Sequence, residues 1–177
     1  MGSKFTSSES IEGLSSLDIS DYSFMRIDLL GIDRYGGRAA LVGEVEFPAG
    51  LEANAPSGGR LGDIFGTFWV ELFLVTDRFL EVLRSEQLSG FKSVRVTVSG
   101  NSVVPPVSML QVLGRCGPVS SEGIGRALDP RTLDGSDIFV PANESTILLS
   151  AKAGAVLSSA GLRNVEITPA GLEAASV

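Results

Sequence analysis

Apolar and polar residues alternate in two early stretches of the chain, and this alternation predicts a β-hairpin. One stretch runs from Phe24 to Leu29 and the other from Ala39 to Phe47. Alternation of this kind suits strands with one buried face. Two glycines within residues 33–37 supply turn chemistry between the stretches. Residues 51–62 are rich in Ala, Pro, Ser and Gly and are expected to form a loop.

Two later regions each predict a strand, a helix and a second strand. In the first region the elements are expected at residues 69–75, 76–86 and 91–98, and in the second at residues 147–149, 150–160 and 165–168. Residues 103–112 are expected to continue the sheet at an edge or to break it, because Pro105 and Pro106 cannot donate to a neighbouring strand. Residues 114–131 resemble a linker, and the tail from Ala170 is expected to fray.

The two regions are copies of one unit. Asp63-Ile64-Phe65 recurs 74 residues later as Asp137-Ile138-Phe139, and residues 62–90 hold eight identities at that offset. Unrelated windows of this length give roughly two identities. Thr76 and Ser150 both stand where a hydroxyl would cap a helix. Gly90 and Gly161 mark the helix exits. The two aspartates are interpreted as structural, each capping a turn.

The apolar stripe of the first helix recurs on the second. The stripes are Phe79, Val82 and Leu83 on the first helix and Ala153, Val156 and Leu157 on the second. The spacing predicts one buried face per helix. We therefore expect an α+β fold with a mixed sheet of two repeated strand–helix–strand units plus the N-terminal β-hairpin. Residues 1–20 are expected to be a flexible segment and residues 21–177 a single domain, with the units at about 61–100 and 135–170. Each half alone buries too little to stand free.

The order of these elements resembles a known family. The helix exits read Leu-Ser-Gly-Phe at residues 88–91 and Leu-Arg-Asn-Val at 162–165, and the linker carries Arg115-Cys116-Gly117. Over about residues 60–169 the chain resembles bacterial immunity proteins of polymorphic toxin systems, in particular the double-CxxCG-motif family. The resemblance implies a protein that binds and neutralises a cognate toxin by protein–protein contact.

The cysteine content of this chain differs from that of the double-CxxCG-motif family. Its two Cys-x-x-Cys-Gly motifs look like zinc ligands, since four thiolates suit a closed tetrahedral site. Here Cys116-Gly117 is all that remains of one motif, and no second pair exists. A structural zinc is therefore not carried over, and neither a metal nor another cofactor is expected.

The composition and charge of the chain limit the kinds of molecule that are expected as its partner. The chain has 177 residues, a net charge of -7 and a pI near 4.6, so nucleic acid is not expected as a partner and a basic protein fits better. A single cysteine allows no internal disulfide, and no apolar run reaches the about 20 residues of a membrane helix. A cytoplasmic location, no membrane contact, and a monomer or small homo-oligomer are expected.

The inventory of reactive groups favours a protein that is not an enzyme. The absence of histidine excludes His-based triads and His-ligated metals. Cys116 is interpreted as an inert thiol. Three weaker motifs fail on spacing or context, and these are Ser89 to Lys92, Gly123 to Gly125, and Asp129, Asp134 and Asp137.

Exposed acids and aromatics near the first unit are the predicted partner-binding residues. They are Glu44, Glu46, Phe68, Trp69, Glu71, Asp77 and Glu81. Glu44 and Glu46 are two residues apart and would share one face of a strand. Two other function classes stay open: a non-catalytic scaffold whose duplicated unit self-assembles, and an enzyme that uses only carboxylates.

Overall fold

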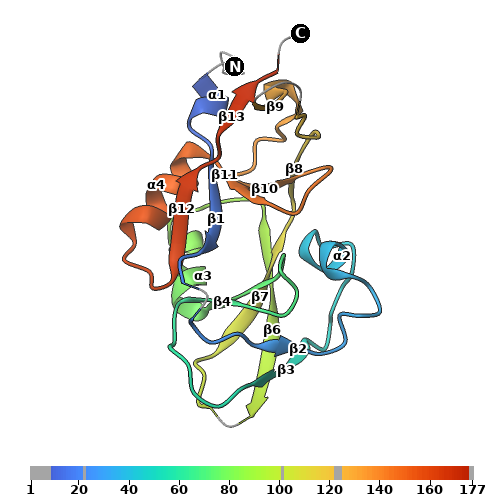
Figure 1. Ribbon diagram of the computed structural model, residues 1–177, viewed down its shortest axis with the longest axis vertical. Coiled ribbons are helices and arrows are strands. Elements are labelled where there is room, and N and C mark those ends of the chain that lie inside the picture. Colours follow the sequence, from blue (N-terminus) through green and yellow to red (C-terminus); the bar gives the residue numbers. More distant parts are fainter. Residues whose placement is uncertain (1–8, 22, 101, 122–124, 176–177) are drawn as a thin grey trace.

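Two mixed β-sheets form the body of the protein, one above the other in Figure 1. The computed structural model describes residues 9–21, 23–100, 102–121 and 125–175. The upper sheet has the order β12 (Val165–Pro169), β1 (Ser15–Ile19), β11 (Ile147–Leu149), β10 (Ile138–Pro141) and β8 (Gly114–Cys116). The lower sheet has the order β2 (Asp28–Leu29), β3 (Leu51–Ala55), β6 (Phe91–Gly100), β7 (Val107–Val112), β5 (Phe73–Thr76) and β4 (Ile64–Gly66). These mixed sheets confirm the predicted α+β class.

The helices are short, and the two longest lie on the same side of the molecule (Figure 1). The helical segments are α1 (Glu9–Glu12), α2 (Gly37–Leu41), α3 (Asp77–Ser85), α4 (Ala151–Ser159) and a 3-10 turn at Pro130–Thr132. A small parallel pair joins β9 (Arg126–Leu128) to β13 (Leu172–Ala174). One continuous apolar core includes Phe79 and Leu83 of the lower half and Leu149 and Leu157 of the upper half. Both halves therefore share one buried interior.

The predicted repeat is confirmed element by element. The helices α3 and α4 begin at Asp77 and Ala151, and β6 and β12 begin at Phe91 and Val165, each pair 74 positions apart. Strands β4 and β5 likewise correspond to β10 and β11. We call β4, β5, α3, β6 and β7 unit one, and β10, β11, α4, β12 and β1 unit two.

The fourth strand of each unit comes from a different part of the chain. In unit one it is β7, which follows β6 and lies between β5 and β6. In unit two it is β1, which comes from the N-terminal region and lies between β11 and β12. The registers agree, because Met109 faces Leu74 just as Ser16 faces Leu148. Unit two is thus completed by the beginning of the chain.

Strand β1 corrects the prediction that residues 1–20 form a flexible segment. Residues 1–8 lie outside the described residues, but β1 is antiparallel to both β11 and β12, and Leu17 and Ile19 are buried. The inward position Ser15 is polar, so only Leu17 and Ile19 carry the apolar alternation, which is a weak signal. The partners of β1 lie more than 125 residues away along the chain, so local sequence did not reveal it.

The predicted N-terminal hairpin is wrong in its second strand. β2 is antiparallel to β3 rather than to residues 39–47, and residues 39–47 instead form part of α2 followed by turns. Three consecutive residues, Ala40 to Val42, are buried, which suits a helix end rather than an alternating strand. Gly43 then takes a φ of 74° and turns the chain away.

Three segments predicted as irregular or peripheral carry strands. The expected loop at 51–62 contains β3, whose small alanines face inward. Strand β7 is central and fully buried, because Pro105 and Pro106 precede it instead of interrupting it. The linker at 114–131 contains β8 and β9, and the tail from Ala170 contains β13.

Candidate functional site

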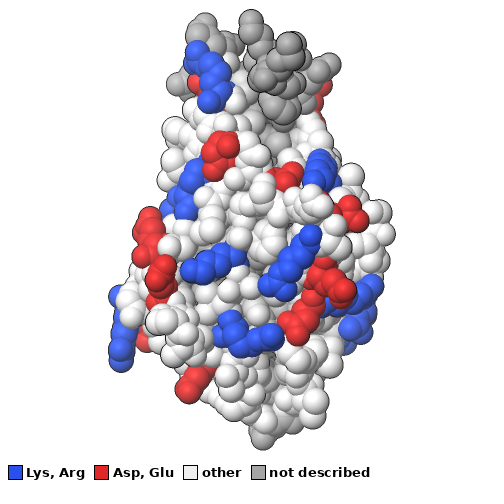
Figure 2. All heavy atoms as spheres, turned by 180° about the vertical axis from the view of Figure 1, so that it is seen from behind, with Lys and Arg blue, Asp and Glu red and all other residues white. Residues whose placement is uncertain are grey.

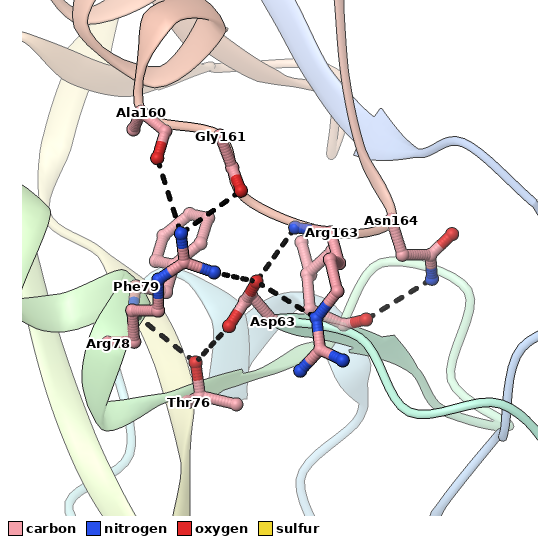
Figure 3. Close-up of polar contacts among 9 residues, drawn as sticks. Asp63, Thr76, Arg78, Phe79, Ala160, Gly161, Arg163 and Asn164 are labelled. Atoms are coloured by element: carbon pink, nitrogen blue, oxygen red, sulfur yellow. Dashed lines mark hydrogen bonds and ion pairs between the residues drawn. The ribbon is translucent and has the colours of Figure 1, made fainter.

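Asp63 lies at the joint between the two units, and its contacts are structural. Its side chain is 3% exposed. One carboxylate oxygen accepts a hydrogen bond from the Thr76 hydroxyl at 3.2 Å, and the other accepts from the backbone N–H of Arg163 at 2.7 Å. The Arg78 guanidinium donates to this second oxygen at 3.0 Å, and Asn164 follows in the same exit loop (Figure 3). Asp63 therefore ties its own helix to the helix exit of unit two.

Asp137 makes the reciprocal connection. It accepts from the Ser150 hydroxyl at 2.9 Å and from the backbone N–H of Ser89 at 2.9 Å. Ser89 and Arg163 are equivalent positions, 74 residues apart. Each aspartate thus holds the helix exit of the opposite unit, and the two contacts are related by the repeat. This arrangement accounts for the recurring Asp-Ile-Phe motif without a catalytic role.

The helix caps and exits follow the sequence prediction. Thr76 and Ser150 accept hydrogen bonds from the N–H of Phe79 and Ala153 at 3.3 and 3.1 Å, so both N-caps are confirmed. Equivalent exit positions also share one backbone conformation. The φ angles are 90° at Gly90 and 65° at Asn164, and 53° at Gln87 and 64° at Gly161. The fold imposes this conformation even where the residue is not glycine.

The loop between β4 and β5, residues 67–72, exposes two apolar side chains. Phe68 is 62% exposed and Val70 is 79% exposed, whereas Trp69 is half-buried and packs against the core. The buried Thr67 hydroxyl oxygen lies 2.8 Å from the Trp69 carbonyl oxygen and accepts from Trp69 N–H at 3.1 Å. A second contact joins it to the Leu72 carbonyl oxygen at 3.1 Å. One internal hydroxyl therefore fixes the loop with both apolar side chains outward.

Arg26 supports this loop from outside unit one. Its guanidinium lies 5.2 Å from the centre of the Phe68 ring, within the range of a cation–π contact. The same group donates to the Thr67 carbonyl oxygen at 2.8 Å. Phe68 is thus held in place while most of its ring stays open to solvent.

The equivalent loop of unit two, residues 142–146, is used internally. Asn143 accepts from the N–H of Val119 at 2.9 Å and donates to its carbonyl oxygen at 2.8 Å. Arg38 donates to the carbonyl oxygens of Pro141 and Ala142 at 3.0 and 3.1 Å and to that of Glu144. The loop is therefore anchored to other parts of the chain.

The structure divides the seven predicted partner-binding residues among three places. Phe68, Trp69 and Glu71 share the unit-one loop, where Glu71 is half-buried against Gly37 of α2. Asp77 and Glu81 lie one turn apart on the exposed face of α3. Val70 was not among the predicted partner-binding residues, which were chosen from acids and aromatics, although it lies between Trp69 and Glu71 in the sequence.

Glu44 and Glu46 form the third group, and their predicted strand is wrong. Both are exposed but lie in the turns after α2. The Glu46 carboxylate is 3.9 Å from the Lys92 amine across a hollow beside β6. Asp77 of α3 pairs with Arg95 of β6 at 3.2 Å. Figure 2 shows the same pattern over that view of the molecule, with acidic and basic side chains interspersed.

The side chains that the sequence offered for catalysis or metal binding are either buried or engaged in contacts with other residues of the chain. Burial, with smaller contributions from the nearby carboxylates of Asp134 and Glu144, raises the pKa of Cys116 from 9.0 to about 11, so its thiol is protonated at neutral pH. The Ser89 hydroxyl lies 3.1 Å from the Asp137 carboxylate, and Asp129 pairs with Arg131. Within the described residues, no three His, Cys, Asp or Glu side chains gather as a metal site. Two of the three residues from Gly123 to Gly125 lie outside the described residues.

Comparison with protein-family models and with curated protein sequences gave no match to this chain. In the described part of the chain, none of the helices has the length and apolar character needed to cross a membrane. The described residues form a two-unit framework in which the loop between β4 and β5 exposes two apolar side chains, Phe68 and Val70.

Proposed function

We propose that this protein is a cytoplasmic immunity protein that binds and neutralises a cognate bacterial toxin by protein–protein contact, without catalysis. The observation that carries the proposal is the unit-one loop, where Phe68 and Val70 project into solvent while Thr67 and Arg26 hold the backbone. Binding energy at protein interfaces concentrates in a few aromatic and apolar anchors. A loop that is already ordered loses little conformational entropy when it binds.

The charge of the chain favours a basic toxin. A net charge of -7 attracts a basic partner over distances of about 10 Å and raises the association rate. Asp77 and Glu81 on α3 contribute exposed carboxylates on unit one. The anchors then set the dissociation rate, and the charge sets how quickly the complex forms.

Co-expression with the toxin encoded in the neighbouring reading frame tests the proposal. The wild-type protein is expected to restore growth and to co-purify with the toxin. Replacing Phe68 by Ser is expected to weaken binding by at least about tenfold. It is expected to lower the unfolding midpoint only slightly, because the ring is mostly solvated and loses a single contact with Arg26.

Val103→Ser is the matched control. Val103 is 93% exposed in the segment between β6 and β7, so this variant removes an apolar side chain that is even more exposed than Phe68 from another place. It is expected to bind as the wild type does. The proposal fails if the wild type neither rescues growth nor co-purifies, and the assignment to the loop fails if both variants weaken binding equally.

One observation favours the alternative of a self-assembling scaffold. The outer edge of β12 has no neighbouring strand among the described residues, whereas β6 is longer than β12 and pairs with β3 over its residues 96–100. Open strand edges can pair with a second chain. Light scattering separates the two proposals, because a stable higher oligomer without toxin affinity would favour the scaffold.

A further inference from the structure

A hollow of about 260 Å³ lies between α4 and the strands β1 and β12 of unit two. Its walls are small or apolar, formed by Ala151, Gly154, Ala155, Ser158, Ile167 and Pro169. The apolar walls suit an aliphatic chain, and Glu12 adds a carboxylate at the border of the hollow.

Unit one fills the equivalent space with its own side chains. Arg84 of α3 reaches across to β6 and donates to the Ser93 hydroxyl at 3.3 Å, where unit two has Ser158 and Ile167. Leu80, which is 2% exposed, stands where unit two has Gly154. The hollow therefore exists because unit two lacks the side chains that close unit one.

The Asp77–Arg95 ion pair closes the other end of the space in unit one, at 3.2 Å. Its counterparts in unit two are Ala151 and Pro169, which cannot form an ion pair. Both links from helix to strand are thus missing from unit two, and the hollow stays open along its length.

Ser15 of β1 supplies an independent sign that the hollow takes a ligand. The residue is 9% exposed, and its hydroxyl oxygen is buried without a hydrogen-bond partner in the described structure. It points at α4, since a Cβ on Gly154 would lie 2.5 Å from this oxygen. A buried hydroxyl without a partner is costly and uncommon, so an incoming polar group at this point would remove that cost.

We propose that the hollow binds an arginine side chain carried by a protein partner. The methylene stem would lie against Ala155 and Ile167, as the stem of a long basic side chain commonly lies on apolar surface. The guanidinium would donate to the Ser15 hydroxyl and face the Glu12 carboxylate. Arg84 in the equivalent place of unit one shows that this framework accommodates an arginine between helix and strand. The net charge of -7 favours such a partner.

Titration with a pentapeptide, acetylated and amidated at its ends and carrying one arginine between alanines, tests the site by NMR. The expected shifts are confined to the amides of residues 12–15, 151–158, 167 and 168. A matched peptide with neutral citrulline is expected to bind about tenfold more weakly, because it lacks the charge-assisted hydrogen bond. Shifts spread over the whole surface, or equal binding of the two peptides, would overturn the proposal.

Three variants locate the interaction. Ser158→Arg copies Arg84 and is expected to fill the hollow and abolish peptide binding. Ser159→Arg adds the same charge to the next residue of the same helix and is expected to leave binding intact. Ser15→Ala is expected to raise the unfolding midpoint while weakening peptide binding about tenfold, since the hydroxyl accepts a hydrogen bond from a charged donor.

Equal effects of Ser158→Arg and Ser159→Arg would show a general charge effect and reject the site. The Phe68→Ser variant is expected to bind the peptide normally. A failed peptide titration therefore leaves the proposed function untouched, and a failed toxin experiment leaves the arginine site standing.

Discussion

The loop after β4 in unit one and the loop after β10 in unit two occupy equivalent places, yet their surroundings differ. In unit two, Arg38 and Asn143 attach the loop to the rest of the chain. In unit one, Thr67 holds the loop from within, and Phe68 and Val70 remain exposed. The same framework position thus serves internal packing in one copy and is open to a partner in the other.

At the sheet faces and edges the difference is reversed, because unit one is the more covered copy and unit two the more open one. Unit one is covered by additional chain, because α2 lies over β7, where Gln111 donates to the Ala40 carbonyl oxygen at 2.9 Å, and β3 extends the sheet beyond β6. Among the described residues, unit two has no counterpart of either cover, and the equivalent of Gln111, 93 residues earlier, is the exposed Asp18. The comparison teaches that the duplicated core is retained, while each copy leaves a different surface open.

The joint between the units gives the largest expected effect. Asp63→Ala leaves the buried Thr76 hydroxyl and the Arg163 N–H without their acceptor and removes the ion pair with the exposed Arg78. We expect it to lower the free energy of unfolding by about 3 kcal/mol. Asp137→Ala removes a more exposed carboxylate with uncharged donors, and about 1 kcal/mol is expected. Urea unfolding measures both. Equal losses would show that the two halves of the joint are energetically alike.

Substitutions of the two arginines that hold the unit-one and unit-two loops are expected to give the next largest loss of stability. Arg38→Ala removes a charged donor from three carbonyl oxygens of unit two, and we expect a loss of about 2 kcal/mol. Arg26→Ala removes one such bond and the contact with Phe68, and about 1 kcal/mol is expected. Thermal unfolding of the two variants compares them. A larger loss for Arg26→Ala would contradict the view that the unit-two loop is the more firmly held.

Substitution of Cys116 is expected to have the smallest effect on stability, and this effect depends on pH. Cys116 is buried in β8 beside unit two. Strands β7 and β1 correspond at an offset of 93 residues, and at this offset Cys116 corresponds to Ser23, which is exposed. Because burial raises the pKa of the thiol from 9.0 to about 11, the unfolded chain loses this proton at lower pH than the folded one. Stability should therefore fall as the pH rises from 9 to 11.

Cys116→Ala isolates this contribution. Relative to the variant, the wild type is expected to lose about 1 kcal/mol between pH 8 and pH 10, measured by urea unfolding at each pH. A difference that stays constant over this range would show that the thiol is not shielded as its 5% exposure implies.

The sequence by itself determined the repeated framework. The apolar spacing of α3 and α4, the caps at Thr76 and Ser150, and the 74-residue offset are local properties, and the structure confirms them. Phe68 was also one of the predicted exposed aromatics near the first unit, and the structure places it at the surface. Helix periodicity and capping depend on neighbours within a few residues, so they can be recognised without the rest of the chain.

Tertiary structure alone decided which segments complete the two units and which surfaces stay open. Strand β1 gains its place from β11 and β12, and residues 39–47 fold over β7 instead of pairing with residues 24–29. Strand identity depends on cross-strand neighbours and burial more than on intrinsic preference. The exposure of Val70, the anchoring of the unit-two loop and the unpartnered Ser15 hydroxyl likewise depend on side chains that are distant in sequence, which is why only the fold revealed them.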